Sequence, residues 1–456
     1  MRESVQFFLA SFLAALCLCL GPTYGEPLTI TNVTCTPTNL SMTWNHVTNL
    51  YILEQSSSLV TGQWEYVGEW VLSTNTTTVP NEAISAFYRV RKVRVIDFHD
   101  PNFEAAVKSW LWVKYQPADE VYDIDVETLS VLIVWSSSIS DMREIYEFKS
   151  LDGLLCSDNQ LTELDASGCE ALTQLYCYDN NLTNLDVSGC TKLQSLLCHN
   201  NNLATLDMSS NTSITNLSCD NNTNLVSLNL SGCTNLARLS FGFTALTNLN
   251  LSSCTQLVEL SSQDNHGIAA LDLSANSLLA RLTFSGNSLT KLDLSSNTNL
   301  TYLFIGACQS LTNVTFALNT NLVDLTCRYC DSLENLDLSA HKALETVYCT
   351  QNYVLSNLNV SGCGNLTDLI CRQNNLASLT LSNANLATVI CEINNMTNLD
   401  VSGCPNLTYL DCFDNKLANV DVSSNPALDY FRCYNNLLTD LDLSENRELT
   451  QLDCNA

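Results

Sequence analysis

Residues 172–191 read LTQLYCYDNNLTNLDVSGCT, and this stretch decides the fold because variants of it fill the rest of the chain. The shared pattern is L-x-x-L-x-C-x-x-N-x-L-x-x-L-D-V-S, and residues 129–456 hold fifteen such units and a partial sixteenth. A short, sustained period of this kind is the sequence signature of a solenoid. The units are 20 to 22 residues long and begin at Leu129, Leu151, Leu172, Leu193, Ile214, Leu236, Leu257, Leu279, Leu300, Leu322, Leu344, Leu366, Leu386, Leu407, Leu428 and Leu449.

Each unit contains one segment with the alternation of a β-strand. Successive side chains of a strand point to opposite faces, so Leu175 and Cys177 are expected to face inward while Tyr176 and Tyr178 face outward. One such strand cannot bury its apolar face alone, but strands stacked about 4.8 Å apart form a parallel sheet over a continuous core. We therefore predict a β-rich solenoid over residues 129–456, with a curved parallel sheet and little helix.

The repeat pattern resembles the leucine-rich repeat, in the bacterial variety that carries Cys in the strand and occurs in secreted internalin- and adhesin-like proteins. The segment DPNFEAAV at residues 100–107 is also similar to the opening of that family. The resemblance covers residues 129–456. It implies a secreted or cell-surface interaction module that binds a protein partner through the concave face of the solenoid, in adhesion or recognition.

The N-terminus has the layout of a secretory signal peptide. Residues 5–20 are apolar and follow Arg2, and cleavage after Gly25 suits the preference for small residues at that position. We predict a signal peptide at residues 1–25 and a secreted or surface-bound mature chain. No other apolar run approaches the ~18 residues that a membrane span requires, so we expect no span in the mature chain.

Two short regions separate the signal from the repeats. Residues 27–95 alternate in period two, as at 40–44 (LSMTW), and resemble a fibronectin-like antiparallel β-sandwich. Residues 97–128 are predicted to form a helical N-terminal cap, because Asp100 suits a helix N-cap and Pro101 the first helical position. A terminal cap is what a repeat array requires.

Composition excludes several function classes. The chain of 456 residues has 47 acidic and 19 basic side chains and a net charge of −28, which argues against a nucleic-acid partner. Neither a P-loop nor a G-x-S-x-G motif occurs. We predict a non-enzyme without catalytic residues, cofactor or metal, because none of the five histidines forms a ligand pair: His46, His99, His199, His266 and His341.

Most of the 22 cysteines fall on repeat positions. Eleven occupy the inward strand position, six occupy the SGC or SSC turn, and Cys308 and Cys330 replace the repeat Asn. Other units carry Phe, Ser, Ile or Asn at these places, which indicates that Cys acts as a small buried group. A disulfide framework, typical of secreted proteins, is the alternative. The motif Cys327-x-x-Cys330 is explained by repeat positions and does not by itself predict a metal site.

Two polar residues also recur. Asn appears eight residues after the start of most units, as at Asn180 and Asn201, and we expect buried amides that bond the backbone of neighbouring coils. Asp recurs in the LDVS segment, as at Asp186 and Asp207. Neighbouring Asp charges repel, so they are either solvated, bonded to local N–H groups, or bridged by Ca²⁺.

The outward strand positions form the candidate binding face, since extended faces of solenoids are their usual binding surfaces. Its C-terminal part is rich in Tyr and Arg, the residues that dominate interface energies. Cross-strand packing that stiffens the sheet is the alternative role. The predicted partner-binding residues are Arg328, Tyr348, Arg372, Tyr409, Phe413, Tyr430, Arg432 and Tyr434.

Three further possibilities stay open. The aromatic side chains are also compatible with a carbohydrate-binding surface protein, and the repeats with a structural envelope component. The sequence stops at Ala456 inside a repeat, without a polar cap. An open strand edge invites pairing, so end-to-end self-association at the C-terminus is an additional expectation.

Overall fold

A computed structural model describes residues 30–35, 39–44, 50–56, 65–66, 76–80, 87–115 and 120–455. The chain divides into two compact units, Met1–Asp97 with Leu111–Thr128, and Phe98–Trp110 with Leu129–Ala456. The second unit holds all the repeats. The signal peptide predicted at residues 1–25 lies outside the described residues.

The first unit contains two antiparallel three-stranded sheets, with strand orders β1-β2-β5 and β4-β3-β6. The strands expected from the alternating pattern are therefore present. The described residues do not show a packed sandwich, so the fibronectin-like domain at 27–95 stays a prediction. The strands are β1 (Ile30–Cys35), β2 (Asn39–Trp44), β3 (Leu50–Ser56), β4 (Glu65–Tyr66), β5 (Thr76–Pro80) and β6 (Phe87–Val93).

Among the described residues, helix occurs in α2 (Pro101–Tyr115) and α3 (Asp123–Glu127), which precede the repeats, and in the 3₁₀ helix η2 (Arg143–Glu147) of the first repeat. The predicted N-cap is confirmed, because Asp100 Oδ1 accepts from the N–H of Asn102 at 2.7 Å. The predicted cap at 97–128 is divided, since only residues 98–110 belong with the repeats. Among the described residues, no helix has the length and apolarity needed to cross a membrane.

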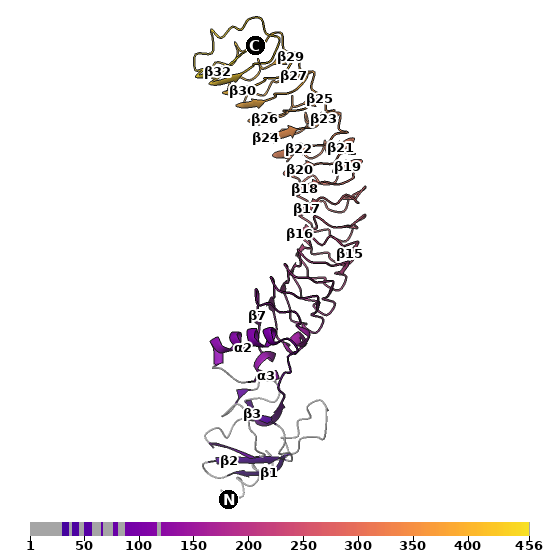
Figure 1. The fold of residues 1–456 in the computed structure, drawn as a ribbon, viewed down its shortest axis with the longest axis vertical. Coiled ribbons are helices and arrows are strands. Elements are labelled where there is room, and N and C mark those ends of the chain that lie inside the picture. Colours follow the sequence, from indigo (N-terminus) through magenta and orange to yellow (C-terminus); the bar gives the residue numbers. More distant parts are fainter. Residues whose placement is uncertain are drawn as a thin grey trace, which may run out of the picture. The chain divides into compact units, whose positions relative to one another are not determined.

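The repeats form the predicted parallel solenoid, in which sixteen strands follow one another along a single sheet on the inner, concave side of the curve (Figure 1). Equivalent residues pair in register, so that Leu175 lies opposite Leu154 and Leu196. The strands are β7 (Val131–Ile133), β8 (Gly153–Leu155), β10 (Gln174–Tyr176), β12 (Ser195–Leu197), β14 (Asn216–Ser218), β16 (Arg238–Ser240), β17 (Glu259–Gln263), β18 (Arg281–Ser285), β20 (Tyr302–Gly306), β22 (Asp324–Arg328), β24 (Thr346–Thr350), β26 (Asp368–Ile370), β28 (Thr388–Ile390), β30 (Tyr409–Asp411), β31 (Tyr430–Arg432) and β32 (Gln451–Asp453).

The core is the stack of inward side chains. Leu175 and Cys177 are fully buried while Tyr176 and Tyr178 are partly exposed, as the alternation predicts. The same assignment recurs along the array, and each buried Leu contributes about 1.5–3 kcal/mol to stability. Every cysteine that the structure describes in the repeats is a free thiol, and all of these except Cys454 are buried.

A second set of short strands, which the sequence analysis did not predict, lies on the outer side of the coils (Figure 1). They form five parallel pairs and carry many of the LDVS aspartates. The pairs are β9 (Glu163–Asp165) with β11 (Asn184–Asp186), β13 (Thr205–Asp207) with β15 (Ser227–Asn229), β19 (Lys291–Asp293) with β21 (Asn313–Thr315), β23 (Asn335–Asp337) with β25 (Asn357–Asn359), and β27 (Ser378–Thr380) with β29 (Asn398–Asp400).

The buried asparagines join neighbouring coils, as expected. Asn201 Oδ1 accepts from Leu182 N–H at 2.9 Å, and its Nδ2 donates to the carbonyls of Cys177 at 3.0 Å and Cys198 at 3.1 Å. One amide therefore satisfies backbone groups of two coils that the turn would otherwise leave unpaired. The same bonds recur at Asn180, Asn222, Asn394, Asn415 and Asn436.

The turn cysteines are hydrogen-bond donors as well as small buried groups, which extends the sequence interpretation. Cys190 Sγ donates to the carbonyl of Ala166 at 3.1 Å. In the next coil Asn211 stands at the equivalent position, and its Nδ2 donates to the carbonyl of Val187 at 2.9 Å. Burial raises the pKa of the Cys190 thiol to about 12, so the donor proton is retained at neutral pH. The interchange of Cys and Asn at this turn reflects a shared donor role.

Replacement of Cys190 tests that donor role. Cys190→Val keeps an apolar group of similar size but removes one of the two donors to the Ala166 carbonyl, which also accepts from the N–H of Cys169 at 2.9 Å. We therefore expect the free energy of unfolding to fall by about 0.5–1 kcal/mol. Cys190→Asn restores an N–H donor and is expected to cost less. Denaturant unfolding of both variants measures the difference, and a valine variant more stable than the asparagine variant contradicts the donor role.

Lowering the pH should weaken the hydrogen bonds that the aspartates of the LDVS segments accept. Asp207 Oδ1 accepts from Ser209 N–H at 2.9 Å, and this bond lowers the pKa of Asp207. A carboxylate with a lowered folded-state pKa stabilises the fold above its ordinary pKa of about 4, and that contribution is lost as the pH falls from there through the lower folded-state pKa. Asp207→Asn keeps the acceptor, as Asn229 does for Ser231. In thermal unfolding at pH values lowered stepwise from about 4, the melting temperature should therefore fall less for this variant than for the wild type; equal falls contradict the assignment.

Candidate binding surface

The structure places the eight predicted partner-binding residues on the strands β22 to β31 of the concave sheet or within two residues of the C-terminal ends of those strands. One row runs in register through Tyr348, Ile370, Ile390, Asp411 and Arg432. A second row, two residues further along each strand, is Arg328, Thr350, Arg372, Glu392, Phe413 and Tyr434. Tyr409 and Tyr430 pair in a third row on the other side of the first. We call these three rows the C-terminal concave surface.

Two pairs of aromatic rings on this surface are stacked face to face. The ring centroids of Tyr409 and Tyr430 lie 4.3 Å apart with an angle of 5° between the planes. Those of Phe413 and Tyr434 lie 4.5 Å apart at 8°. Each pair joins the neighbouring coils that carry β30 and β31, so the rings contribute to packing between coils, and their binding role stays a prediction.

Arg432 is held at several points between these stacks. Its Nη1 lies 3.0 Å from Asp411 Oδ2, and its Nη2 donates to the hydroxyl of Tyr434 at 2.9 Å. Its guanidinium carbon also lies 4.7 Å from the centroid of the Phe413 ring. A guanidinium fixed by ion pair, hydrogen bond and cation–π contact is rigid, which lowers the entropic cost of using it in an interface.

The other three predicted residues are freer. Tyr348 is 45% exposed. Arg372 makes one ion pair, with Nη1 3.5 Å from Glu392 Oε1. Arg328 is exposed and lies over the ring of Phe304, 4.9 Å from its centroid. The surface therefore has a rigid part on β30 and β31 and a looser part on β22 to β26.

Burial determines the pKa shifts of the ionisable groups on the C-terminal concave surface. Burial raises the pKa of Asp411, against the lowering effect of Arg432, and burial likewise raises the pKa of Glu392, with Arg372 acting against it. Burial, followed by a hydrogen bond with Tyr430, raises the pKa of Tyr409 to about 12. Both carboxyl groups thus lie in a poorly hydrated part of an otherwise polar sheet.

Further along the same sheet, His199 belongs to a separate polar cluster. Its ring stacks on Tyr178, with centroids 4.5 Å apart, and its Nδ1 lies 3.3 Å from Ser218 Oγ. That hydroxyl also donates to Asp220 at 2.9 Å, so the serine stands between the histidine and the acid. A catalytic histidine is oriented by the acid directly, and this order does not do that. The cluster can bind polar groups but does not prepare a nucleophile.

Sequence reasoning missed a row of exposed residues at the turn that follows each strand. Phe243, Tyr329 and Ile393 have left-handed backbones with φ of 53°, 55° and 56°, and all three side chains are exposed. Bulky or β-branched residues rarely adopt this conformation. The signal was present in the sequence, because other units mostly carry Asp, Asn, Gln, Gly or Ala at this position, as at Asp158, Asp179, Asn200, Asn221, Asp264, Gly286, Ala307, Gln351, Gln373, Asp414 and Asn435.

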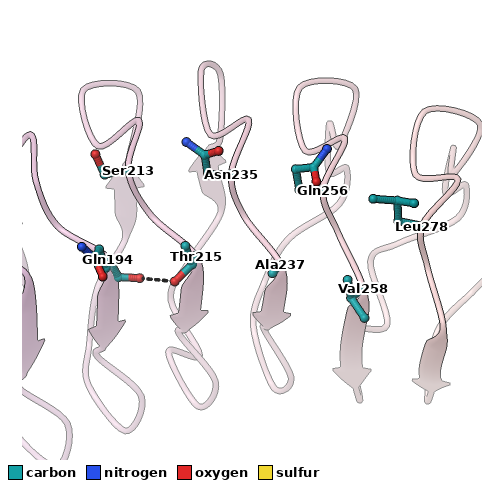
Figure 2. A pocket seen from close by; sticks show the side chains of 8 residues that line it. All are labelled: Gln194, Ser213, Thr215, Asn235, Ala237, Gln256, Val258 and Leu278. Carbon is teal, nitrogen blue, oxygen red and sulfur yellow. Dashed lines mark hydrogen bonds between the residues drawn. The ribbon is translucent and has the colours of Figure 1, made fainter.

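A shallow groove crosses the coils that carry β12 to β18 (Figure 2). The hydroxyl of Thr215 donates to the Gln194 carbonyl at 3.0 Å across its floor. None of the lining side chains is titratable, so the groove carries no chemistry of its own. It is lined by Gln194, Ser213, Thr215, Asn235, Ala237, Gln256, Val258 and Leu278.

The CxxC motif does not stand out as a metal centre. Cys327 and Cys330 are both buried, and Cys330 Sγ donates to the carbonyl of Arg328 at 3.5 Å. Within residues 30–455, as far as they are described, no group of three or more Cys, His, Asp or Glu side chains could hold a metal ion.

Comparison with known proteins identifies similar solved structures. The functional domain of InlJ from Listeria monocytogenes, which includes a cysteine ladder, is 33% identical and has a TM-score of 0.58, covering 75% of this chain and 76% of that one. The internalin InlF of the same organism is 16% identical with a TM-score of 0.45, covering 78% of this chain and 95% of that one. No protein-family model and no curated protein matches the chain.

The stacking of Tyr409 on Tyr430 predicts a measurable contribution to stability. Tyr430→Ala removes one ring of the pair, and we expect the free energy of unfolding to fall by about 1 kcal/mol. Tyr430→Phe keeps the stack but removes the hydroxyl, so stability should change less while the pKa of Tyr409 drops below its value of about 12. Denaturant unfolding and the alkaline titration of tyrosine absorbance measure the two effects. An alanine variant as stable as the wild type shows that the stack does not hold the coils together.

Proposed function

Because this chain belongs to the bacterial internalin-like leucine-rich repeat proteins that carry a cysteine ladder, we propose that it is a secreted or cell-surface interaction module whose C-terminal concave surface binds a protein partner. Extended concave sheets of solenoids suit this role because they present many side chains at fixed spacing. The signal-like segment at residues 1–25 supports export, and the similarity to the InlJ domain supports an interaction role.

The observation that carries the proposal is the pre-organised group of aromatic and arginine side chains on β30 and β31. Tyr, Phe and Arg contribute most of the binding energy at protein interfaces. Here Tyr409, Tyr430, Phe413, Tyr434 and Arg432 are only partly buried and are already fixed by mutual stacking and hydrogen bonds. A partner that docks on them orders few additional side chains, which favours tight binding.

The strained residue Ile393 supports the same surface. It directly follows Glu392 in the chain, and its N–H donates to the carbonyl of Phe413 at 3.1 Å. A left-handed β-branched residue costs the fold on the order of 1–2 kcal/mol, and here 40% of it is in contact with solvent. Stability does not account for an isoleucine there, whereas an apolar contact with a partner does.

A carbohydrate ligand is less well supported. Aromatic binding sites for sugars need open ring faces, and stacking covers one face of each ring in the pairs Tyr409–Tyr430 and Phe413–Tyr434. Arg432 also lies over the rings of the second pair. A structural role in an envelope layer and self-association through the edge strand β32 also remain proposals, and neither explains the exposed isoleucine.

Ile393→Asn separates binding from stability. Asn occupies the equivalent turn position at Asn200, Asn221 and Asn435, so we expect the free energy of unfolding to rise by about 1 kcal/mol. Partner affinity should fall, because the exposed apolar side chain is lost. The full chain is first used to isolate binding proteins from a host or community proteome, each is then produced pure, and its dissociation constant is measured for both forms of the chain.

Two controls complete this experiment. Ala307→Asn changes a left-handed position outside the cluster and should leave affinity unchanged. Tyr353→Ala removes an exposed tyrosine that is not on the concave sheet and should also have no effect. Partners that bind Ile393→Asn and Arg432→Ala as tightly as the wild type, or binding confined to a glycan array, contradict the proposal.

A further inference from the structure

Two buried carboxylates of the C-terminal concave surface are only half satisfied. Glu392 is 5% exposed and Asp411 is 3% exposed. Each uses one oxygen in an ion pair, Glu392 Oε1 with Arg372 and Asp411 Oδ2 with Arg432. The other oxygens, Glu392 Oε2 and Asp411 Oδ1, are buried and have no hydrogen-bond partner among the described residues. A buried acceptor without a donor costs about 1–3 kcal/mol, and more for a charged group.

The two carboxylates belong to neighbouring coils. The N–H of Cys391 donates to the carbonyl of Asp411 at 2.8 Å, which places Glu392 directly beside the Asp411 strand. The charge of Asp411 acts on Glu392. Two acidic groups that repel each other, each paired with an arginine through one oxygen and without a donor at the other, form a site that can accept further N–H donors from a cation.

We propose that Glu392 and Asp411 receive the ammonium group of a lysine side chain of the protein partner, an inference that rests on the function proposed above. An ammonium has three N–H donors on a narrow, flexible stem and can serve two carboxylates at once. A metal ion fits less well, because the described residues provide no third ligand there. The lysine stem has apolar neighbours, since Ile390 pairs with Asp411 and Phe413 follows Glu392 in its row.

The charge of the chain favours a basic partner. The net charge of −28 attracts cationic surfaces over a long range and raises the rate of encounter. The site then selects among the groups that reach it, because a donor is needed at the two unpaired oxygens and a cationic donor also gains from the charge of both carboxylates.

Arg372 is the replaceable counter-ion of this site. Its contact with Glu392 is long, at 3.5 Å, and 52% of its side chain is exposed. Arg432, by contrast, is fixed by Asp411, Tyr434 and the Phe413 ring. An incoming lysine therefore displaces Arg372 and leaves Arg432 in place. Arg372 therefore competes with the incoming lysine, although the sequence analysis predicts it as a partner-binding residue.

The test uses the full chain and a short oligolysine peptide labelled with a fluorophore, with the fully acetylated peptide as the uncharged control. Binding is measured by fluorescence anisotropy at low and at physiological salt. We expect Glu392→Gln and the double variant Glu392→Gln/Asp411→Asn to weaken oligolysine binding about tenfold or more, which corresponds to about 1.4 kcal/mol. Asp421→Asn/Asp442→Asn removes two negative charges in the LDVS row and should change affinity by less than about twofold.

Arg372→Gln gives the most specific result. Removing the competing cation should tighten oligolysine binding several-fold, whereas a site for an acidic ligand predicts weaker binding. This variant leaves both carboxylates in place, so it keeps the test valid if the double variant fails to fold in far-ultraviolet circular dichroism. Equal loss of affinity in the two double variants, or weaker binding by Arg372→Gln, overturns the lysine site.

The experiments distinguish failure of the lysine site from failure of the proposed function. If oligolysine binding is insensitive to Glu392 while Ile393→Asn still loses its protein partners, the lysine site is wrong and the concave interaction surface stands. If purified partners are indifferent to both changes, both proposals are wrong.

Discussion

The structure depends on one constraint: each coil must find hydrogen-bond partners for its turning backbone inside the coil next to it. A strand of three to five residues contributes few ladder bonds of its own. The turns on either side expose carbonyl and N–H groups to an apolar interior, where an unpaired group costs more than a leucine gains. Asn201 meets this requirement by bonding the backbone of two coils at once. Cys190 and Asn211 meet it at the opposite turn by donating to the preceding coil.

The inward Asn and Cys groups are uncharged and bonded to the backbone, so the outward strand positions can vary. Because the backbone register is fixed by inward groups, outward strand residues are free to carry tyrosine, arginine or glutamate without altering the coil. The stacked pairs on β30 and β31 use this freedom, and their rings align because equivalent residues of adjacent strands are in register. The exposed Ile393 and the half-satisfied Glu392 and Asp411 depart from what stability alone favours. Such departures are expected where a surface serves binding.

Much of the fold was accessible from the sequence because the repeat fixes it. Period and alternation predicted the parallel sheet, the inward leucines and the buried asparagines, and the residues proposed for binding lie on adjoining rows of the sheet. The short outer strands were missed because a three-residue pair such as β9 with β11 has little alternation to detect. The pairing of Arg432 with Asp411, and the unpaired oxygens beside it, depend on side-chain rotamers between coils, which a one-dimensional pattern does not specify. The left-handed turn could be inferred from its Asp, Asn and Gly residues, and the bulky exceptions at Phe243, Tyr329 and Ile393 depart from that pattern.

The cysteines allow the most direct test of the central claim. This claim is that the inward groups are neutral and bonded to the backbone of the next coil. Alkylation of the denatured, unreduced protein followed by mass spectrometry reports the state of every thiol. We expect all nineteen cysteines of the repeats to be alkylated, including Cys177 and Cys198 on neighbouring coils. Cross-linked peptides that join such neighbours, with a matching loss of alkylated sites, contradict it.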